Sequence, residues 1–370
     1  MKQASHSTTI SQKNGHHAIP FHACTSSRLH ETNLDDPGFG SSFSDHLFSM
    51  EYRDGSWANE KIIPFADFSC SPAMATLHYG QTVFEGMKAF RGQDGRIQIF
   101  RPRRHFERLN MSCRRMCIPE IDPDFLVQAL KELISVDKDW VPQKKGNALY
   151  IRPLIFATDP YLGVRPSKTY RMFIMTSPVG AYYKEGINPV SLTTTDQYIR
   201  AAKGGSGFIK TACNYGPSLL PALQAQKDGY TQVLWLDAHE HKYIEEVGTM
   251  NIFFKIGGKL ITPGLGGSIL GGVTRDSAIH LAREWGVEVE ERPVSIDEVF
   301  EAHRTGTLEE VFGTGTAAVI SPVGSIHHNG ETIVTDKVQI GPFAQRLYDA
   351  ITGIQYGTQK DTHHWMSDVK

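Results

Sequence analysis

The hydrophobic and polar residues of this chain follow two different periods, which predict a mixture of helices and strands. Apolar residues recur at helical spacing from Phe125 to Ile134, directly after an Asp122-Pro123 pair that is typical of a helix start. Runs rich in β-branched and aromatic residues predict strands at 148–157 and 170–176. The same patterns predict further helices at 101–116, 219–227, 274–285, 295–302 and 343–354, and further strands at 96–100, 232–236, 243–256, 259–262 and 310–319.

These elements do not alternate strictly between strand and helix, so we expect an α/β (α+β) fold of two domains with partly antiparallel sheets. An aperiodic stretch punctuated by proline and glycine, 179–189, is the best candidate for a linker. We therefore expect an N-terminal domain at 41–178 and a C-terminal domain at 190–370.

The first 40 residues differ in composition from the rest of the chain. Residues 1–40 are rich in serine, threonine and histidine and contain no acid before Glu31, which predicts a disordered or loosely attached extension. A mitochondrial transit peptide shares this composition but needs several arginines, and Arg28 is the only one here. A cytoplasmic location is the favoured expectation, with mitochondrial import as the minority alternative.

Composition and charge exclude several classes of protein. With 38 basic and 40 acidic residues among 370, the chain lacks the basic footprint of a nucleic-acid partner, and no apolar run approaches the roughly 18 residues of a membrane span. Five cysteines without a Cys-x-x-Cys pair indicate a reducing compartment, and Cys113 and Cys117 are expected to be buried on one helix face. The histidine pairs have no third ligand at a fixed spacing, so we assign no metal site.

Two segments carry ionisable residues that could perform chemistry. Lys210 follows apolar Phe208 and Ile209 near a glycine-rich turn, where partial desolvation would lower the pKa of its amine. A strand-end lysine that reaches solvent is the simpler alternative. Glu245 and Glu246 lie in a strand-like stretch, where a carboxylate could pair with a protonated pyridine nitrogen. Only one of them can point inward from an extended backbone, and a solvated acid pair is the alternative.

A third segment, 270–275, has the composition of an anion-binding helix start. Its glycines allow close approach of the backbone, a helix N-terminus presents N–H groups, and the similar turn at 313–317 adds threonine hydroxyls. The alternative is an ordinary glycine turn capped by Thr274. A lysine, a carboxylate and a phosphate cup are the three protein parts that a pyridoxal phosphate enzyme requires.

The order of these segments and their residue sequences resemble those of the branched-chain amino acid aminotransferases, a fold-type IV family of pyridoxal phosphate enzymes. The resemblance runs from about residue 43 to residue 356. It implies a smaller N-terminal α/β domain and a larger cofactor-binding C-terminal domain with mixed sheets. The matching stretches are 43–46, 77–79, 84–90, 101–115, 149–153, 177–180, 203–205, 210, 214–216, 232–236, 246–251, 271–275 and 312–317.

The resemblance implies pyridoxal 5'-phosphate as the cofactor and assigns residues to it. Lys210 would form the Schiff base and move the proton between the substrate Cα and the cofactor. Tyr215 would hydrogen-bond the phenolic oxygen of the ring, Glu246 would hold the pyridine nitrogen, and Arg108 would clamp the phosphate bidentately. The remaining implied cofactor-binding residues are Thr249, Val273, Thr274 and Thr316.

The resemblance also implies the reaction and the substrate pocket. The amino group of L-leucine, isoleucine or valine would pass reversibly to 2-oxoglutarate, giving glutamate and a branched-chain 2-oxo acid, as in branched-chain amino acid biosynthesis. In this family Tyr79 and Val164 cross from a neighbouring subunit, which implies a homodimer. The implied substrate-binding residues are Phe43, Tyr79, Phe84, Tyr150, Arg152, Val164, Thr316 and Ala317, the last two through backbone groups that receive the α-carboxylate.

Two pairs of residues depart from the family pattern. Ala212 and Cys213 stand where the family usually has two glycines, so a backbone with positive φ would be strained there and the substrate range altered. Ala318 and Ser321 replace the Cys-x-x-Cys pair of some relatives, so we predict no thiol switch. D-amino acid aminotransferases and aminodeoxychorismate lyases share the core residues and are the alternatives within the fold. A non-catalytic cofactor- or metabolite-binding protein is the remote alternative.

Overall fold

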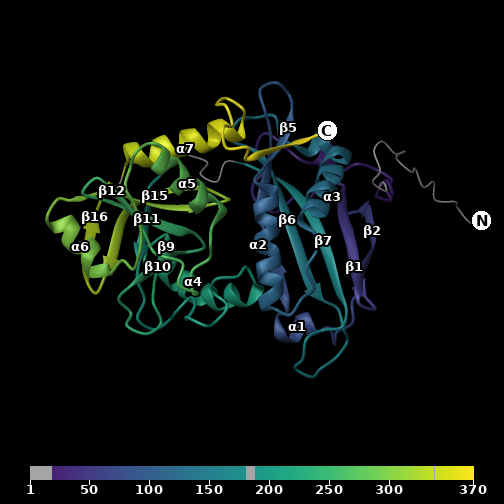
Figure 1. The fold of residues 1–370 in the computed structure, drawn as a ribbon, viewed down its shortest axis with the longest axis horizontal. Coiled ribbons are helices and arrows are strands. Elements are labelled where there is room, and N and C mark those ends of the chain that lie inside the picture. Colours follow the sequence, from purple (N-terminus) through teal and green to yellow (C-terminus); the bar gives the residue numbers. More distant parts are fainter. Residues whose placement is uncertain (1–18, 181–187, 337) are drawn as a thin grey trace, which may run out of the picture. The chain divides into compact units, whose positions relative to one another are not determined.

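The computed structural model describes residues 19–180, 188–336 and 338–370, and these fall into two compact units (Figure 1). The first unit runs up to Ala181 and also includes Gln355–Lys370, and the second is Tyr182–Ile354. Part of the predicted linker at 179–189 lies outside the described residues. None of the helices in the described ranges combines the length and hydropathy needed to cross a bilayer.

The first unit is built on an eight-stranded antiparallel sheet of order β17-β5-β4-β6-β7-β1-β2, with β3 paired to β6. Its strands are β1 (His46–Arg53), β2 (Ser56–Pro64), β3 (Thr82–Phe84), β4 (Met87–Arg91), β5 (Ile97–Phe100), β6 (Ala148–Ala157), β7 (Tyr170–Val179) and β17 (Met366–Val369). Its helices are α1 (Ala75–Tyr79), α2 (Pro102–Arg115) and α3 (Pro123–Val136), with short 3-10 turns η1 (Leu29–Glu31) and η2 (Lys138–Trp140).

Helices α2 and α3 pack together and cover one face of this sheet (Figure 1). The predicted start of α3 is confirmed, because the Asp122 carboxylate accepts a hydrogen bond from the Asp124 N–H at 3.1 Å. The apolar stripe of α3, from Leu126 to Ile134, is completely buried, so this face of the helix forms part of the hydrophobic core. Cys113 is buried in α2 as predicted. Cys117 is exposed, contrary to the prediction, because α2 has already ended at Arg115.

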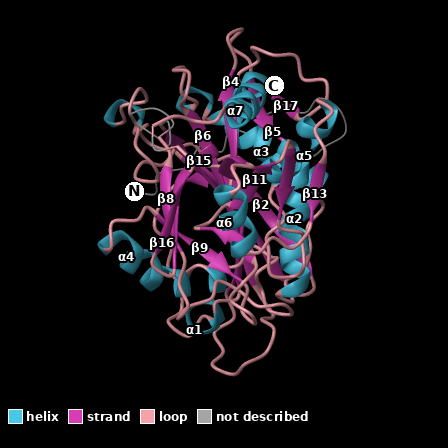
Figure 2. Cartoon of the chain, turned by 90° about the vertical axis from the view of Figure 1, so that its left-hand side faces the viewer, coloured by secondary structure: helices cyan, strands magenta, loops and turns pink. Residues whose placement is uncertain are grey.

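The second unit is a nine-stranded mixed sheet of order β10-β9-β8-β15-β14-β11-β12-β13, with β16 paired to β15 (Figure 2). Pairs β8–β15, β8–β9 and β12–β13 are parallel. The strands are β8 (Val190–Thr193), β9 (Gln232–Leu236), β10 (Ile244–Val247), β11 (Asn251–Ile256), β12 (Lys259–Thr262), β13 (Val289–Glu291), β14 (Leu308–Gly315), β15 (Val319–His328) and β16 (Glu331–Val334). The helical elements are η3 (Ala212–Asn214), η4 (Gly216–Ser218), α4 (Leu219–Lys227), α5 (Val273–Glu284), α6 (Ile296–Arg304) and α7 (Pro342–Gln355).

Two strands predicted as continuous are each divided in the second unit. The stretch 243–256 is interrupted by a tight turn in which Val247 and Met250 exchange backbone hydrogen bonds of 2.9 and 2.8 Å. Gly248 has φ +54° in this turn, a conformation that suits glycine. The stretch 310–319 is likewise broken, at the turn between β14 and β15. Both turns lie where candidate site residues were expected, so the breaks shape the site.

The predicted extension at 1–40 begins outside the described residues, but residues 19–40 are packed on the first unit. Ile19 joins its core, and the Ile62 N–H donates to the carbonyl of Pro20 at 2.8 Å. Residues 19–40 are therefore not a loose extension. The composition of the segment misled the prediction because a few buried contacts, rather than overall hydrophobicity, hold it in place.

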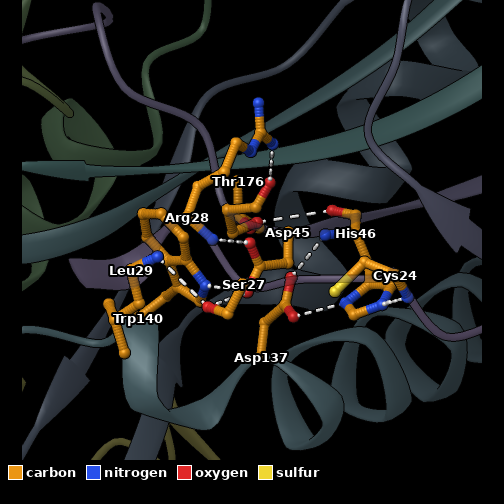
Figure 3. Close-up of polar contacts among 10 residues, drawn as sticks. Cys24, Ser27, Arg28, Leu29, Asp45, His46, Asp137, Trp140 and Thr176 are labelled. Carbon is orange, nitrogen blue, oxygen red and sulfur yellow. Dashed lines mark hydrogen bonds and ion pairs between the residues drawn. The ribbon is translucent and has the colours of Figure 1, made fainter. Parts of the chain in front are cut away.

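A buried polar network holds this segment against β1 and the end of α3 (Figure 3). The Asp45 carboxylate accepts hydrogen bonds from the Ser27 hydroxyl at 2.6 Å, the Arg28 N–H at 2.8 Å and the Trp140 indole at 2.9 Å. His46 accepts the Cys24 N–H at Nε2, so its Nδ1 carries the proton and donates to the Asp137 carboxylate at 2.7 Å. Every one of these donors and acceptors is paired, which gives the network a structural role.

Candidate active site

Lys210 and Tyr215 form a hydrogen-bonded pair in the second unit. The Lys210 Nζ donates to the Tyr215 hydroxyl at 3.0 Å. The 3-10 turn of residues 212–214 between them is closed by a backbone hydrogen bond from the Tyr215 N–H to Ala212. The turn brings the two side chains to the same side of the chain, so the predicted amine and its phenolic partner are neighbours.

The loop that precedes Lys210 is fixed by Asn214. Its amide donates to the carbonyls of Ser206 and Ile209, both at 2.8 Å, and accepts from the Ser206 hydroxyl at 2.6 Å. Ala212 and Cys213 lie in the right-handed 3-10 turn, a conformation that ordinary L-residues adopt. The absence of the family's two glycines therefore introduces no backbone strain at these positions.

A β-bulge places both adjacent acids, Glu245 and Glu246, inside the protein. In the pairing of β10 with β9, Ile244 lies opposite Leu236 and Glu246 opposite Trp235, so one extra residue is inserted between them. The expectation that only one acid can point inward is therefore wrong, because it assumed a regular extended backbone. The alternative of a solvated acid pair is also wrong, since the two residues are 7% and 3% exposed.

Glu246 is held by a backbone donor and a buried arginine. Its Oε1 accepts from the Leu270 N–H at 2.6 Å and lies 3.3 Å from the Arg200 Nη2. Burial raises the pKa of Glu246, whereas Arg200, the Leu270 N–H and the nearby Lys210 ammonium act against this rise. The site therefore contains a buried carboxylate whose ionised form is favoured by two cations and one oriented N–H.

Glu245 faces a different partner, the Ser268 hydroxyl, which donates to its Oε1. Burial raises the pKa of Glu245 as well. Arg200 also donates to the carbonyl of Ser268, so the arginine and both acids converge on the loop at 268–270. This convergence fixes the path of the chain into α5.

The N-terminus of α5 begins after a glycine, without a side-chain cap. Gly272 is the N-cap and has no side chain to accept the first helical N–H groups, and Val273 and Thr274 are the first two helical residues. The alternative of a cap by Thr274 is wrong, because Thr274 lies within the helix. Asn251 fits against the loop, donating to the Leu270 carbonyl at 2.8 Å. A Cβ on Gly272 would collide with the Asn251 amide oxygen.

The remaining predicted residues of the second unit lie in its two tight turns. Thr249 is in the β10–β11 turn, and Thr316 and Ala317 are in the turn between β14 and β15. Val319, which ends this second turn, has φ +64°, an unusual value for a β-branched residue. The turn is thus held in a strained conformation at the place where backbone groups are predicted to receive a carboxylate.

In the first unit, β3 and β6 gather the aromatic and cationic side chains of the predicted substrate pocket. Tyr150 and Arg152 are two residues apart on β6 and share a face, and the Arg152 Nη2 donates to the Tyr150 hydroxyl at 3.2 Å. The Arg152 guanidinium lies 4.9 Å from the centre of the Phe84 ring. A Cβ on Gly86 would collide with the Tyr150 hydroxyl, so glycine is required there.

Three other predicted residues of the first unit have different surroundings. Phe43 stacks on Phe65 with ring centres 4.7 Å apart. Tyr79 is on α1 and donates to the carbonyl of Leu162, and Val164 is 86% exposed on the loop after β6. Tyr79 and Val164 therefore lie on an exposed surface of their own unit.

Arg108 is on α2 and is engaged by an acid that the sequence did not single out. Its Nε and Nη2 donate to the two oxygens of Glu85, at 2.7 and 2.8 Å. The same edge of the guanidinium cannot also grip a phosphate. The bidentate clamp of a phosphate by Arg108 stays a prediction, and it would have to use N–H groups other than the two that Glu85 accepts.

The residues present fit pyridoxal phosphate. The second unit alone supplies the amine, its phenolic neighbour, a buried carboxylate and an N-terminus capped only by glycine. Sequence reasoning missed Glu85, Arg200 and the role of Asn251. Glu85 and Asn251 lie inside the matched stretches, so their positions in the motifs could have identified them as site residues. In the ranges that the structure describes, no group of three His, Cys, Asp or Glu residues could hold a metal ion.

Comparison with known proteins agrees with this geometry. The family profile described as amino-transferase class IV matches residues 82–326, and this chain belongs to that family. Branched-chain-amino-acid aminotransferase 2 of Bacillus subtilis is 51% identical over 346 residues, covering 93% of this chain and 95% of the relative. The fold also resembles the crystal structure of the Escherichia coli branched-chain amino acid aminotransferase, with a TM-score of 0.72, 29% identity, and coverage of 88% of this chain and 99% of that one. The Thermobaculum terrenum enzyme in its PLP form gives the same TM-score and identity, with coverage of 88% and 98%.

Proposed function

We infer that this chain is a pyridoxal phosphate-dependent branched-chain amino acid aminotransferase. It transfers the amino group of L-leucine, isoleucine or valine to 2-oxoglutarate, which gives glutamate and a branched-chain 2-oxo acid. The observation that carries the inference is the pairing of Lys210 with Tyr215 close to the buried Glu246 carboxylate. A protein that only binds metabolites has no need to keep this combination of amine, phenol and buried carboxylate together.

The bound cofactor supplies a protonated pyridine ring that draws negative charge away from the substrate Cα. Lys210 Nζ would take the proton from the substrate Cα and deliver it to the cofactor carbon bonded to the transferred nitrogen, and the reverse half-reaction would move it back. The Tyr215 hydroxyl, 3.0 Å away, orients Nζ for this transfer. Glu246 would hold the protonated pyridine nitrogen, and Arg200, 3.3 Å from its Oε1, favours the ionised form of that carboxylate.

The substrate pocket must bind two chemically different side chains in turn. A leucine side chain needs apolar surface, and the γ-carboxylate of glutamate needs a cation. Arg152 lies 4.9 Å from the centre of the Phe84 ring and donates to the Tyr150 hydroxyl, so an aromatic face and a hydroxyl accompany its charge when an apolar side chain is bound. The backbone groups of Thr316 and Ala317 receive the α-carboxylate.

A second copy of the chain is the proposed partner. Exposed apolar side chains gather on α1 and the loop after β6: Leu77, Tyr79, Tyr161, Leu162 and Val164. The Tyr79–Leu162 hydrogen bond joins the two segments into one surface. We expect a homodimer in the cytoplasm. Light scattering should show a dimer for the wild type and a shift toward monomer for Val164→Asp. A wild type that is itself monomeric would contradict the proposal.

A visible spectrum tests the function directly. Protein loaded with pyridoxal phosphate should show a visible band that L-leucine bleaches and 2-oxoglutarate restores. D-alanine is the control for stereochemistry, and bleaching by D-alanine alone would move the chain to the D-amino acid branch. A protein that takes up no cofactor would overturn the proposed function.

A further inference from the structure

Glu245 and Glu246 form a pair of adjacent buried acids beside a single arginine. The β-bulge opposite β9 places both side chains inside the second unit, where the two residues are 7% and 3% exposed. The Arg200 Nη2 lies 3.3 Å from the Glu246 Oε1, and the charge of Arg200 also favours the ionised form of Glu245. Two buried carboxylates therefore share one guanidinium.

The hydrogen bonds of this group are incomplete. The Glu245 Oε1 accepts from the Ser268 hydroxyl. Among the residues that the structure describes, however, neither the Glu245 Oε2 nor the Arg200 Nε has a hydrogen-bond partner, although both atoms are buried. Buried polar atoms in a purely structural network are normally paired, as they are around Asp45. The acid pair and its arginine therefore do more than hold the fold together.

The charges of this group are also unbalanced. Burial raises the pKa of both acids, and two neighbouring negative charges disfavour one another's ionisation. Arg200 can offset the charge of one carboxylate. Lys210 also acts on Glu246, but Lys210 is the amine proposed to react with the cofactor, and Asp237 adds a further negative charge near Glu245. A cation placed against Glu246 would offset the excess negative charge.

We propose that Glu245 is a specificity-determining residue whose buried negative charge, added to that of Glu246, makes the site prefer a cofactor ring that carries a proton on its nitrogen. The proposal rests on the proposed function, in which Glu246 faces the ring nitrogen. Glu245 does not need to touch the ring. Because it shares Arg200 with Glu246, it leaves the charge of Glu246 incompletely neutralised, and a protonated ring supplies the missing positive charge.

The experiment compares the cofactor with an analogue whose ring cannot be protonated. Apo-protein is titrated with pyridoxal phosphate and with its carbocyclic analogue, in which C–H replaces the ring nitrogen, and binding is followed by protein fluorescence. Both aldehydes meet the same Lys210 amine, so the ratio of the two affinities isolates the ring nitrogen. Wild type should prefer pyridoxal phosphate. Glu245→Gln should lower this preference roughly tenfold, the equivalent of one pKa unit.

Two further variants separate the charge of Glu245 from its hydrogen bond. Glu245→Gln removes the charge but keeps an oxygen that can accept from the Ser268 hydroxyl. Ser268→Ala does the reverse, so it should retain the wild-type preference even if both affinities fall. Glu245→Asp keeps the charge and should retain more of the preference than Glu245→Gln. The aspartate variant remains informative if the glutamine variant folds poorly.

Glu301→Gln is the matched control. Glu301 pairs with Arg304 on α6 of the same unit, where both side chains are exposed, and it has no part in the proposed site. This variant also removes one negative charge and should leave both affinities unchanged.

Several results would overturn the inference. An unchanged preference in Glu245→Gln would show that Glu245 is neutral or acts only through its hydrogen bond. An equal loss of preference in Ser268→Ala would assign the effect to that hydrogen bond, and a wild type without any preference would remove the effect itself. If wild type binds no pyridoxal phosphate, the proposed function fails. If wild type binds it with a preference that every variant keeps, only this inference fails.

Discussion

Glu246 and Asn251 hold the two polar backbone groups of the same loop residue, Leu270. Glu246 accepts its N–H at 2.6 Å, and Asn251 donates to its carbonyl at 2.8 Å. The carboxylate proposed for the pyridine nitrogen and the helix start proposed for the phosphate are therefore tied together through one residue. Such a tie sets the spacing between the two ends of a rigid ligand.

Loss of the Asn251 amide should weaken cofactor binding. Asn251→Ala removes the donor to Leu270 and should lower the affinity for pyridoxal phosphate about tenfold. Gly272→Ala should have a similar effect, because the new methyl collides with the Asn251 amide oxygen. The double variant should cost less than the sum of the two, since removing the amide makes room for the methyl.

Gly266→Ala is the control for these loop substitutions. It adds a methyl to the same loop, and the nearest atom would be 3.9 Å away, an ordinary contact. Its affinity should equal that of wild type. Strict additivity of Asn251→Ala and Gly272→Ala would show that the two residues do not act through a shared contact.

Arg200→Met should make stability more sensitive to pH. Burial raises the pKa of Glu246, and without Arg200 that pKa should rise further above the value of about 4.3 for an unfolded glutamate. The folded state then holds its proton more tightly than the unfolded state, so stability is retained at low pH and lost as pH rises through the folded pKa. In thermal melts of the apo-protein, the difference in melting temperature between Arg200→Met and wild type should be larger at about pH 8 than at about pH 5.

The hydrogen bonds that Arg200 donates to Ser268 and Gly207 are lost at every pH, so only the change in this difference with pH reports on Glu246. Arg304→Met, which removes an exposed cation beside Glu301, should give a difference that does not vary with pH. A constant difference for Arg200→Met would contradict the assigned role of Arg200.

Tyr215→Phe should slow the half-reaction with L-leucine while leaving the fold intact. The hydroxyl that orients the Lys210 amine would be absent, and we expect the rate of bleaching to fall roughly tenfold. Lys210→Ala should abolish the reaction. Tyr230→Phe, on a ring that stacks on His327 elsewhere in the unit, is the control and should react at the wild-type rate.

Asp45→Asn should release the segment 19–31 from the first unit. The amide can accept at only one end, so the donors Ser27, Arg28 and Trp140 would not all be satisfied, at a cost of about 2 kcal/mol. Hydrogen exchange should show faster exchange of these backbone amides. Asp54→Asn, at the exposed β1–β2 turn, should leave them protected.

The same contact should weaken in acid. Burial tends to raise the pKa of Asp45, but the hydrogen bonds of Arg28, Ser27 and Trp140 outweigh it and lower the pKa below its usual value. Its contribution is therefore present above the unfolded value of about 3.9 and is lost as pH falls through the folded pKa. Protection of the segment in wild type should decline below about pH 4, whereas Asp45→Asn should show little further decline.

Local signals predicted most of the helices and strands, because caps and periodic apolar stripes depend only on residues that are close together in the sequence. The start of α3 at Asp122 is such a case. The bulge between Ile244 and Glu246 could not be predicted in this way, since it depends on the register with a second strand. The turn at Gly248 was missed because a single glycine inside an apolar stretch also fits a continuous strand.

The predicted site shows the same division. Lys210, Tyr215 and Glu246 were found because the order of the motifs carries them. The pairing of Glu85 with Arg108 joins residues 23 positions apart and depends on how α2 lies against β3 and β4. The packing of residues 19–40 on the first unit was missed for a similar reason, since it depends on a network that includes Asp45 and the distant Trp140.

The pairing of β17 with β5 has a consequence for synthesis. β17 is formed by residues 366–369, yet it completes the sheet whose other strands lie before residue 180. The ribosome must therefore translate the whole second unit before the first can close its edge. Until then β5 presents unpaired backbone groups to the surroundings, and a nascent chain stalled late in translation would be prone to pairing with other strands.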